Sequence, residues 1–220
     1  DHGAGKSYLG FILYDLFFKA KPVGWVYGVE SRAELVEKSA ALAARLGFDR
    51  MRFLATTVQQ ALTDPGLPPS FDVVTALHAC DTATDDAIAF GLAKQARHMV
   101  LVPCCQAEVA SVMRSSKALN LSRTPLAELW RHPLHTREFG SQITNVLRCL
   151  QLEAHGYSVT VTELVGWEHS MKNELILASK TGTGQRAQRE RASERLQQVL
   201  DELGLQALRT RFGVVEQSAA

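Results

Sequence analysis

The first six residues combine two glycines, an acidic side chain and a lysine in a pattern that could bind a charged ligand. The first ten residues read Asp-His-Gly-Ala-Gly-Lys-Ser-Tyr-Leu-Gly, and the apolar residues of 7–20 favour a buried helix that begins among them. Because glycine has no side chain, such a turn lets backbone N–H groups and the positive end of a helix approach a ligand closely. Two ligand classes use this arrangement: a triphosphate held by a P-loop, and an adenosine-containing cofactor held at the edge of a parallel sheet.

The spacing of the glycines distinguishes these ligand classes. A P-loop needs Gly-x-x-x-x-Gly-Lys-Ser, and residues 5–7 supply its end, but its first glycine would precede Asp1. A dinucleotide-binding turn needs a glycine where Tyr8 stands. What remains is an acidic-x-Gly-x-Gly pattern followed, after a predicted strand, by Glu30. A carboxylate at that strand end can accept hydrogen bonds from both ribose hydroxyls of an adenosine cofactor.

A second group of reactive side chains follows two further apolar segments. His78, Cys80 and Asp81 come directly after one segment, and Cys104 comes after the next. Histidine titrates near neutrality, so His78 or Asp81 could accept a proton, whereas a merely hydrogen-bonded histidine is the structural alternative. A zinc site built from His78 and the cysteines at 80, 104 and 105 is a further alternative. No Cys-x-x-Cys pair is present, and no metal is predicted.

The elements that would position these groups alternate along the first half of the chain. The sequence pattern predicts helices at 7–20, 31–46, 56–62 and 82–97, and strands at 23–29, 51–54, 71–77 and 99–102. This alternation indicates an α/β domain with a parallel sheet and right-handed crossovers. Ligands of such a sheet bind beyond the carboxyl ends of its strands, where Glu30, His78 and Cys104 are expected.

The regular pattern weakens in the second half of the chain. We predict a lid-like insertion near 107–140, because irregular segments at the ligand edge of a sheet commonly cover a substrate site. The remaining predicted elements are a short helix at 109–119, a helix at 141–155, an antiparallel hairpin of strands at 157–165 and 174–179, and a charged helix at 185–203. The predicted division is a domain of residues 1–181 and a helical extension of residues 182–220.

The bulk composition limits the partners of the protein. The 220 residues carry 24 basic and 23 acidic side chains, a net charge of +1, so no global field attracts nucleic acid or an acidic membrane. Local RNA contacts could involve the aromatic and basic residues of 130–137 or the arginines of 185–203, with a solvated surface as the alternative at both. Four cysteines make no disulfide framework at this length, and no signal peptide or long apolar span is evident, so the cytoplasm is the expected location.

Five motifs in sequence order support a family resemblance. They are DHGAGKSYLGF, YGVESR, TALHACDTATDD, LVPCCQ and KNELILA, which are similar to motifs of the class I S-adenosylmethionine-dependent methyltransferases. More narrowly, they resemble the methyltransferase domain of the protein named for its glutathione S-transferase C-terminal domain, and of its bacterial relatives. The resemblance implies a Rossmann-like, mostly parallel sheet with a C-terminal antiparallel hairpin. In the family a hydrophobic strand precedes the acidic residue that matches Asp1, so the first strand is expected to be missing and the chain to be a fragment.

The resemblance also implies S-adenosylmethionine as the cofactor and gives roles to single residues. Asp1, Gly3 and Gly5 would line the methionine moiety, Glu30 would hold the ribose, and Thr56 would lie near adenine. The complete predicted cofactor-binding set is Asp1, Gly3, Gly5, Glu30, Ser31, Thr56, Leu77 and His78. The predicted catalytic set, beside the sulfonium and the acceptor, is His78, Cys80, Asp81 and Cys104.

The motifs define the methyl acceptor only in part. Methyltransferases of exocyclic amines often carry Asn/Asp-Pro-Pro-Tyr after the fourth strand, whereas this chain has Leu-His-Ala-Cys at 77–80, so an amine acceptor is not indicated. Cys80 and Cys104 stand where RNA cytosine-C5 methyltransferases place two cysteines, one of which attacks the pyrimidine; cysteines that simply line the pocket are the alternative.

RNA or a small molecule is therefore the expected acceptor, no membrane partner is expected, and the oligomeric state stays open. Two other functions stay open: a P-loop nucleotide-binding protein, and a methyltransferase fold that binds RNA or protein without turnover.

Overall fold

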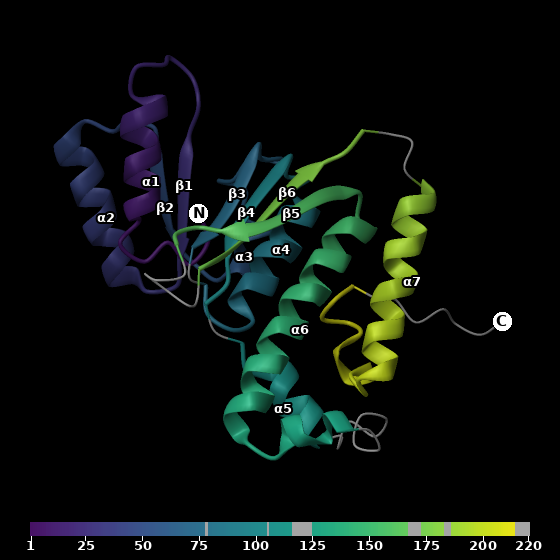
Figure 1. The fold of residues 1–220 in the computed structure, drawn as a ribbon. Coiled ribbons are helices and arrows are strands. Elements are labelled where there is room, and N and C mark those ends of the chain that lie inside the picture. The colour runs from purple at the N-terminus through teal and green to yellow at the C-terminus, as the bar shows by residue number, and fades with distance from the viewer. Residues whose placement is uncertain (78, 105, 116–124, 167–172, 183–185, 214–220) are drawn as a thin grey trace.

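The structure is a computed structural model, and it describes residues 1–77, 79–104, 106–115, 125–166, 173–182 and 186–213 (Figure 1). The strands are β1 Val26–Glu30, β2 Met51–Ala55, β3 Val73–Leu77, β4 His98–Val102, β5 Tyr157–Glu163 and β6 Glu174–Lys180. The α-helices are α1 Tyr8–Leu13, α2 Ala33–Leu46, α3 Val58–Ala61, α4 Ala83–Ala93, α5 Glu108–Ser115, α6 Pro133–Ala154 and α7 Arg186–Glu202. A π-helical segment spans Tyr14–Phe18, and short 3-10 helices span Pro125–Trp130 and Gln206–Leu208.

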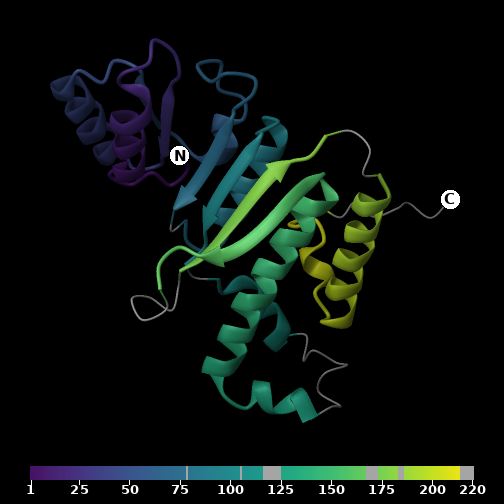
Figure 2. The same cartoon turned by 45° about the horizontal axis from the view of Figure 1, so that its top comes forward.

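The strands form close to their predicted positions and with the predicted directions. β1 pairs in parallel with β2, and β3 pairs in parallel with β4. β6 pairs antiparallel with both β4 and β5, which completes a sheet of order β3-β4-β6-β5 (Figure 2). The predicted α/β class, with parallel strands in its first half and an antiparallel hairpin in its second, is confirmed.

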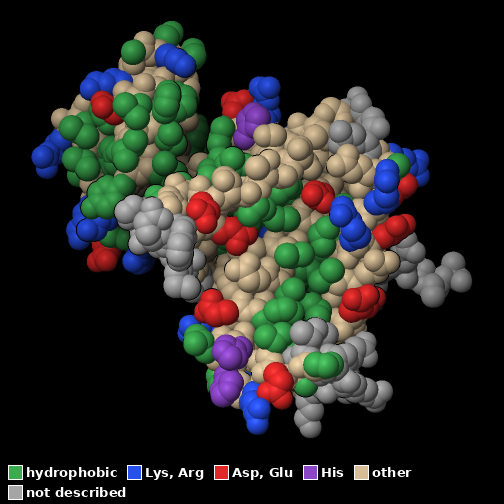
Figure 3. Space-filling view, viewed as in Figure 1, with side chains coloured by type: hydrophobic (Ala, Val, Ile, Leu, Met, Phe, Trp, Pro, Cys, Tyr) green, Lys and Arg blue, Asp and Glu red, His purple; other side chains and the backbone are tan. Residues whose placement is uncertain are grey.

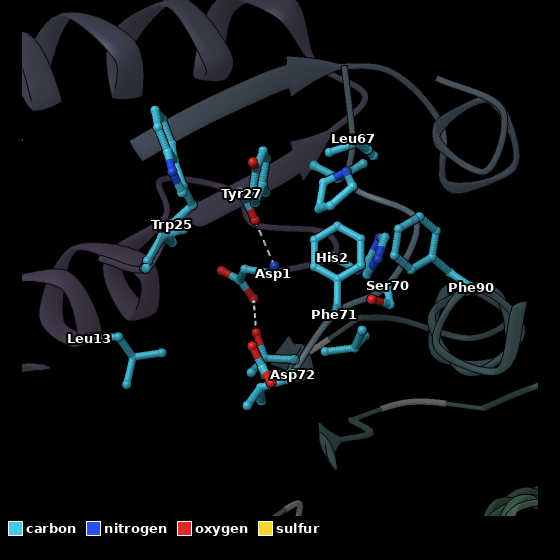
Figure 4. A pocket seen from close by; sticks show the side chains of 18 of the residues that line it. Asp1, His2, Leu13, Trp25, Tyr27, Leu67, Ser70, Phe71, Asp72 and Phe90 are labelled. Carbon is cyan, nitrogen blue, oxygen red and sulfur yellow. Dashed lines mark hydrogen bonds between the residues drawn. The ribbon is translucent and has the colours of Figure 1, made fainter. Parts of the chain in front are cut away.

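The strands are divided into two sheets, because β1 and β3 do not pair with each other. Residues 1–2 bridge their facing edges: His2 N donates to Thr75 O at 2.8 Å, and Val29 N donates to Asp1 O at 2.9 Å. A cavity of about 370 Å³ extends between the same two strands (Figure 4).

The segment near 107–140 is more regular than the sequence predicts. It holds α5, a 3-10 helix and the first two turns of α6, which begins at Pro133 instead of Ser141. Proline is compatible with a helix start, because the first helical residue needs no N–H group and its fixed φ suits the helix. The prediction of irregular structure is therefore wrong from Pro133 onward. Residues 116–124 lie outside the described residues, and the role of this segment as a lid stays a prediction.

The C-terminal helix packs against the middle of the chain. α7 lies along α6 (Figures 1 and 2), and its buried Leu196 and Leu200 share one apolar core with Val109 of α5 and Leu147 of α6. Beyond α7, Arg211 Nε lies 3.3 Å from Glu108 Oε2. The side chains of this extension thus complete a core that α5 and α6 begin, and the division at residue 181 stays a prediction.

Large apolar side chains are exposed on the lobe formed by α1, α2, β1 and β2 (Figure 3). They include Tyr8, Ile12, Leu16, Phe17 and Trp25. Within the described ranges, no helix has the length and the apolar character needed to cross a membrane.

Candidate functional site

The predicted glycine turn has the backbone conformation that glycine favours. Gly3 and Gly5 have φ values of +62° and +58°, in the left-handed region where a side chain would introduce strain. Ala4 N donates to Val29 O at 3.2 Å, and Ser7 N donates to Ala4 O at 2.7 Å. The turn therefore closes against the carboxyl end of β1.

Glu30 ends β1 and is held by several donors. Its Oε2 accepts from Gly5 N at 2.9 Å, and its Oε1 accepts from Arg32 N and Arg32 Nε at 3.0 Å each. Ser31 Oγ lies 3.4 Å from the same Oε1. The side-chain hydrogen bonds from Arg32, followed by the backbone donors, lower the pKa of Glu30 from 4.5 to about 2, although burial acts in the opposite direction. Glu30 is thus an ionised, acceptor-only group that is only 7% exposed.

The predicted cofactor-binding residues gather at one edge of the sheets. Thr56 N donates to Glu30 O at 3.1 Å, which joins the carboxyl ends of β1 and β2. A Cβ atom added to Gly3 would lie 3.8 Å from Ala79 Cβ, so the turn also adjoins the loop after β3. Between β1 and β3, the Asp1 carboxylate accepts from Thr75 Oγ1 at 2.9 Å.

Seven of the eight predicted residues can therefore be placed at or beside this edge: Asp1, Gly3, Gly5, Glu30, Ser31, Thr56 and Leu77. His78 lies outside the described residues. Cofactor binding by these residues stays a prediction.

The same contacts disfavour a phosphate at the turn. A phosphate would need the Gly5 N–H group, but this group already donates a hydrogen bond to the Glu30 carboxylate. The ionised carboxylate would also repel a phosphate, because both groups are negatively charged. The Lys6 side chain is exposed, with its Nζ 5.9 Å from the centre of the Tyr8 ring. The turn therefore suits hydroxyl groups and a cationic or neutral ligand better than a triphosphate.

The loops after β3 and β4 bring three of the predicted catalytic residues together. Cys80 Sγ lies 3.3 Å from Cys104 Sγ. Asp81 Oδ1 accepts from Ala107 N at 3.1 Å, which links the two loops a second time. Asp81 has a φ of +51°, a conformation that costs a non-glycine residue free energy and is often found at functional sites.

Among the described residues, no group of three or more histidine, cysteine or acidic side chains could hold a metal ion. His78 and Cys105, two members of the zinc alternative, lie outside those residues.

A buried polar network beneath these loops was not predicted from the sequence. Arg148 of α6 is fully buried, and its Nε and Nη2 donate to the two Asp85 carboxylate oxygens at 2.7 and 2.8 Å. Arg148 Nη2 also donates to Asp81 O at 2.9 Å, and Nη1 donates to Asn145 Oδ1 at 3.1 Å. Gln106 Nε2 donates to the same Asn145 oxygen at 3.2 Å. The loops after β3 and β4 are therefore both fixed to α6.

A pattern in the sequence could have indicated this network. Asn145 and Arg148 are three residues apart, and so lie on one face of the helix, where leucines are also buried. A charged side chain on such a face needs a buried partner, which points to an acidic residue on another element.

The cavity between β1 and β3 adjoins the cluster around Glu30 through Asp1 and Val29. Tyr27, Phe71 and Phe90 line it together with His2, whose ring centre lies 4.3 Å from that of Phe90 (Figure 4). Mainly because of its burial, the pKa of His2 is lowered from 6.5 to about 3, so the ring is neutral at pH 7. Neither Gly5 nor Glu30 lines this cavity. The strand ends, and not this cavity, therefore form the candidate cofactor site.

The fold belongs to the α/β class, in which ligands bind beyond the carboxyl ends of the parallel strands, and a glycine turn and a strand-end carboxylate stand at that edge. A family model described as a methyltransferase domain matches residues 1–112. The chain belongs to this methyltransferase-domain family. Among curated proteins, none matches the chain.

Solved structures of similar fold include two bacterial proteins. Magnesium protoporphyrin IX methyltransferase from Synechocystis, with bound SAH, is 16% identical, and the match covers 81% of this chain and 71% of that one with a TM-score of 0.45. The YcgJ protein from Bacillus subtilis is 16% identical, and the match covers 91% of this chain and 74% of that one with a TM-score of 0.43.

Proposed function

We propose that this protein is an S-adenosylmethionine-dependent methyltransferase. The observation that carries the proposal is Glu30, a buried carboxylate with a pKa of about 2 at the end of β1, beside the glycine turn of a methyltransferase-domain family member. An ionised carboxylate is a strong acceptor for both hydroxyls of a ribose. S-adenosylmethionine, when bound, supplies an electrophilic methyl group on its sulfonium sulfur.

The donors around Glu30 support a ribose site with one adjustment. Arg32 Nε and Nη2 donate to opposite oxygens of the carboxylate at 3.0 and 3.3 Å, and the Arg32 side chain is 62% exposed. A carboxylate offers roughly four acceptor positions, so the guanidinium and the ribose hydroxyls compete for them. The Arg32 side chain therefore turns into solvent when a ribose binds, while Gly5 N and Arg32 N continue to orient Glu30.

The remaining residues of this edge surround the other parts of the cofactor. The turn of Asp1, Gly3 and Gly5 would lie along the methionine moiety, and Thr56 would lie beside the adenine. The five sequence motifs support placing the chain near the methyltransferase domain of the glutathione S-transferase C-terminal-domain protein. That narrower relationship is part of the proposal.

The acceptor would bind at the loops after β3 and β4. His78 or Asp81 would take up a proton from it, and Cys80 and Cys104 would lie beside it. Because Arg148 fixes the backbone of Asp81 from below, the network would contribute to rate by positioning the loop and not by contacting the acceptor. RNA and small molecules are the acceptor classes that we propose.

Transfer of a labelled methyl group tests this function. The protein is incubated with methyl-labelled S-adenosylmethionine and, separately, with RNA, protein and small-molecule fractions of a cell extract. We expect label in the RNA or small-molecule fraction, and loss of that label in Glu30→Ala but not in Glu34→Ala, which removes an exposed carboxylate on α2. Cofactor binding without label in any fraction would instead favour a binding module without turnover.

A further inference from the structure

The two sulfur atoms in the loops after β3 and β4 lie between two contacts that join these segments. Before them, Leu77 and Val102 are partners in the parallel ladder, and after them Ala107 N donates to Asp81 Oδ1 at 3.1 Å. Neighbouring strands lie about 4.8 Å apart, within the Cα separation of about 4.4–6.8 Å that a disulfide requires. The strands that lead into Cys80 and Cys104 are therefore close enough for a disulfide between the loops that follow them.

The distance between the sulfur atoms decides which chemistry the pair suits. Cys80 Sγ and Cys104 Sγ are 3.3 Å apart, so a movement of roughly 1.3 Å would reach the bond length of about 2.0 Å. Two thiolates on one tetrahedral zinc ion, with Zn–S bonds of about 2.3 Å, would stand roughly 3.8 Å apart. Cys80 is exposed and Cys104 partly exposed, so a small disulfide can reach them.

We propose that Cys80 and Cys104 form a reversible dithiol–disulfide site at the acceptor end of the sheet. With a glutathione-type disulfide as the oxidant, one thiolate attacks a sulfur of the oxidant and releases one glutathione thiol, leaving a mixed disulfide. The second thiolate then attacks the protein sulfur of that mixed disulfide and releases the second glutathione thiol. The protein loses two electrons and two protons, and one oxidant molecule becomes two thiols.

This site does not depend on the proposed methyltransferase function, because it follows from the two loops alone. Its effect on the methyl acceptor rests on that function. The disulfide would join the two loops beside the acceptor, and both sulfur atoms would be bonded to each other.

Cys149 provides an internal reference, since burial, followed by the nearby Glu174 and Glu153, raises the pKa of its thiol to about 12. Such a thiol reacts slowly at pH 8.

Disulfide mapping tests the proposal. The reduced protein is equilibrated with mixtures of oxidised and reduced glutathione, quenched in acid, alkylated, and digested with trypsin without reduction. Cleavage after lysine and arginine places Cys80 in 53–94, residues 104 and 105 together in 98–114, and Cys149 in 149–172. Mass spectrometry should find 53–94 linked to 98–114 within one molecule, and reduction should release the two peptides.

Single serine variants then identify the partners. Cys80→Ser and Cys104→Ser should each lose the link, whereas Cys105→Ser and Cys149→Ser should keep it, with circular dichroism to verify folding. The proposal is overturned if the link persists in Cys104→Ser, if it forms only between molecules, or if a large excess of oxidised glutathione yields only glutathione adducts.

Discussion

At the residue scale, Glu30 links the stability of the protein to the site that we propose for the cofactor. Its donors come from the turn before α1 and from Arg32, so the carboxylate holds two segments in place. The folded protein lowers the pKa of this group from 4.5 to about 2. Such a group stabilises the fold above its unfolded pKa, and the contribution disappears as the pH falls toward the folded pKa.

Glu30→Gln should therefore weaken the dependence of the free energy of unfolding on pH at acid pH. Between pH 4.5 and about 2, the free energy of unfolding of the natural protein should fall more steeply than that of the variant. Urea titrations at several pH values measure this difference, with Glu34→Gln as the control for an exposed carboxylate. Equal slopes in the natural protein and Glu30→Gln would contradict the assigned pKa.

Arg32 gives a second prediction at this scale. If its guanidinium competes with the ribose, Arg32→Gln should bind S-adenosylmethionine more tightly, by up to about fivefold, because an exposed ion pair is worth about 0–1 kcal/mol. The variant should also raise the pKa of Glu30, since the Arg32 side chain is the largest cause of its lowering. Calorimetry measures the affinity. Weaker binding in Arg32→Gln would show that the guanidinium contacts the cofactor instead of competing with it.

At the element scale, α6 supports both loops of the acceptor end through one buried ion pair. Arg148 and Asp85 are 0% and 5% exposed, so removal of either partner leaves an uncompensated charge in the interior. Arg148→Met should lower the free energy of unfolding by about 3–5 kcal/mol. The double variant Asp85→Leu with Arg148→Met should lose less, since no buried charge remains.

Denaturant unfolding measures these changes, and α6 offers a matched control. Arg137 pairs with Glu138 at the surface, with the two side chains 57% and 51% exposed, so Arg137→Met should cost less than about 1 kcal/mol. A loss in Arg148→Met as small as that of the control would contradict the role of the network.

The elements also show what the sequence could predict. The apolar residues of 71–77 and their turn-forming neighbours predict β3 because their burial pattern is local, and the glycine turn is recognisable from backbone requirements alone. The sequence around Pro133 does not define the start of α6, because proline can either interrupt a helix or begin one. Only the packing of the segment decides between these two roles. Asp85 and Arg148 are 63 residues apart, so their pairing depends on tertiary structure that no local pattern contains.

At the scale of the whole molecule, the division into two sheets predicts unequal local stability. Within the part of the chain that the structure describes, the β1–β2 sheet has two strands, whereas the other sheet has four, with β4 and β6 inside it. Small sheets open at lower free-energy cost, because fewer neighbours are lost on opening. Backbone amides of 26–30 and 51–55 should therefore exchange hydrogen faster than those of β4 and β6. Equal protection by exchange mass spectrometry would show that the two sheets open as one unit.

The central claim is that Glu30 binds the ribose of S-adenosylmethionine, and calorimetric titration of that cofactor tests it most directly. The natural protein should bind, and Glu30→Gln should bind on the order of 10- to 100-fold more weakly, because a hydrogen bond to a charged group contributes about 1.5–3 kcal/mol. Glu34→Gln should bind like the natural protein. Equal affinity of Glu30→Gln and Glu34→Gln, or no binding to the folded natural protein, would contradict the claim.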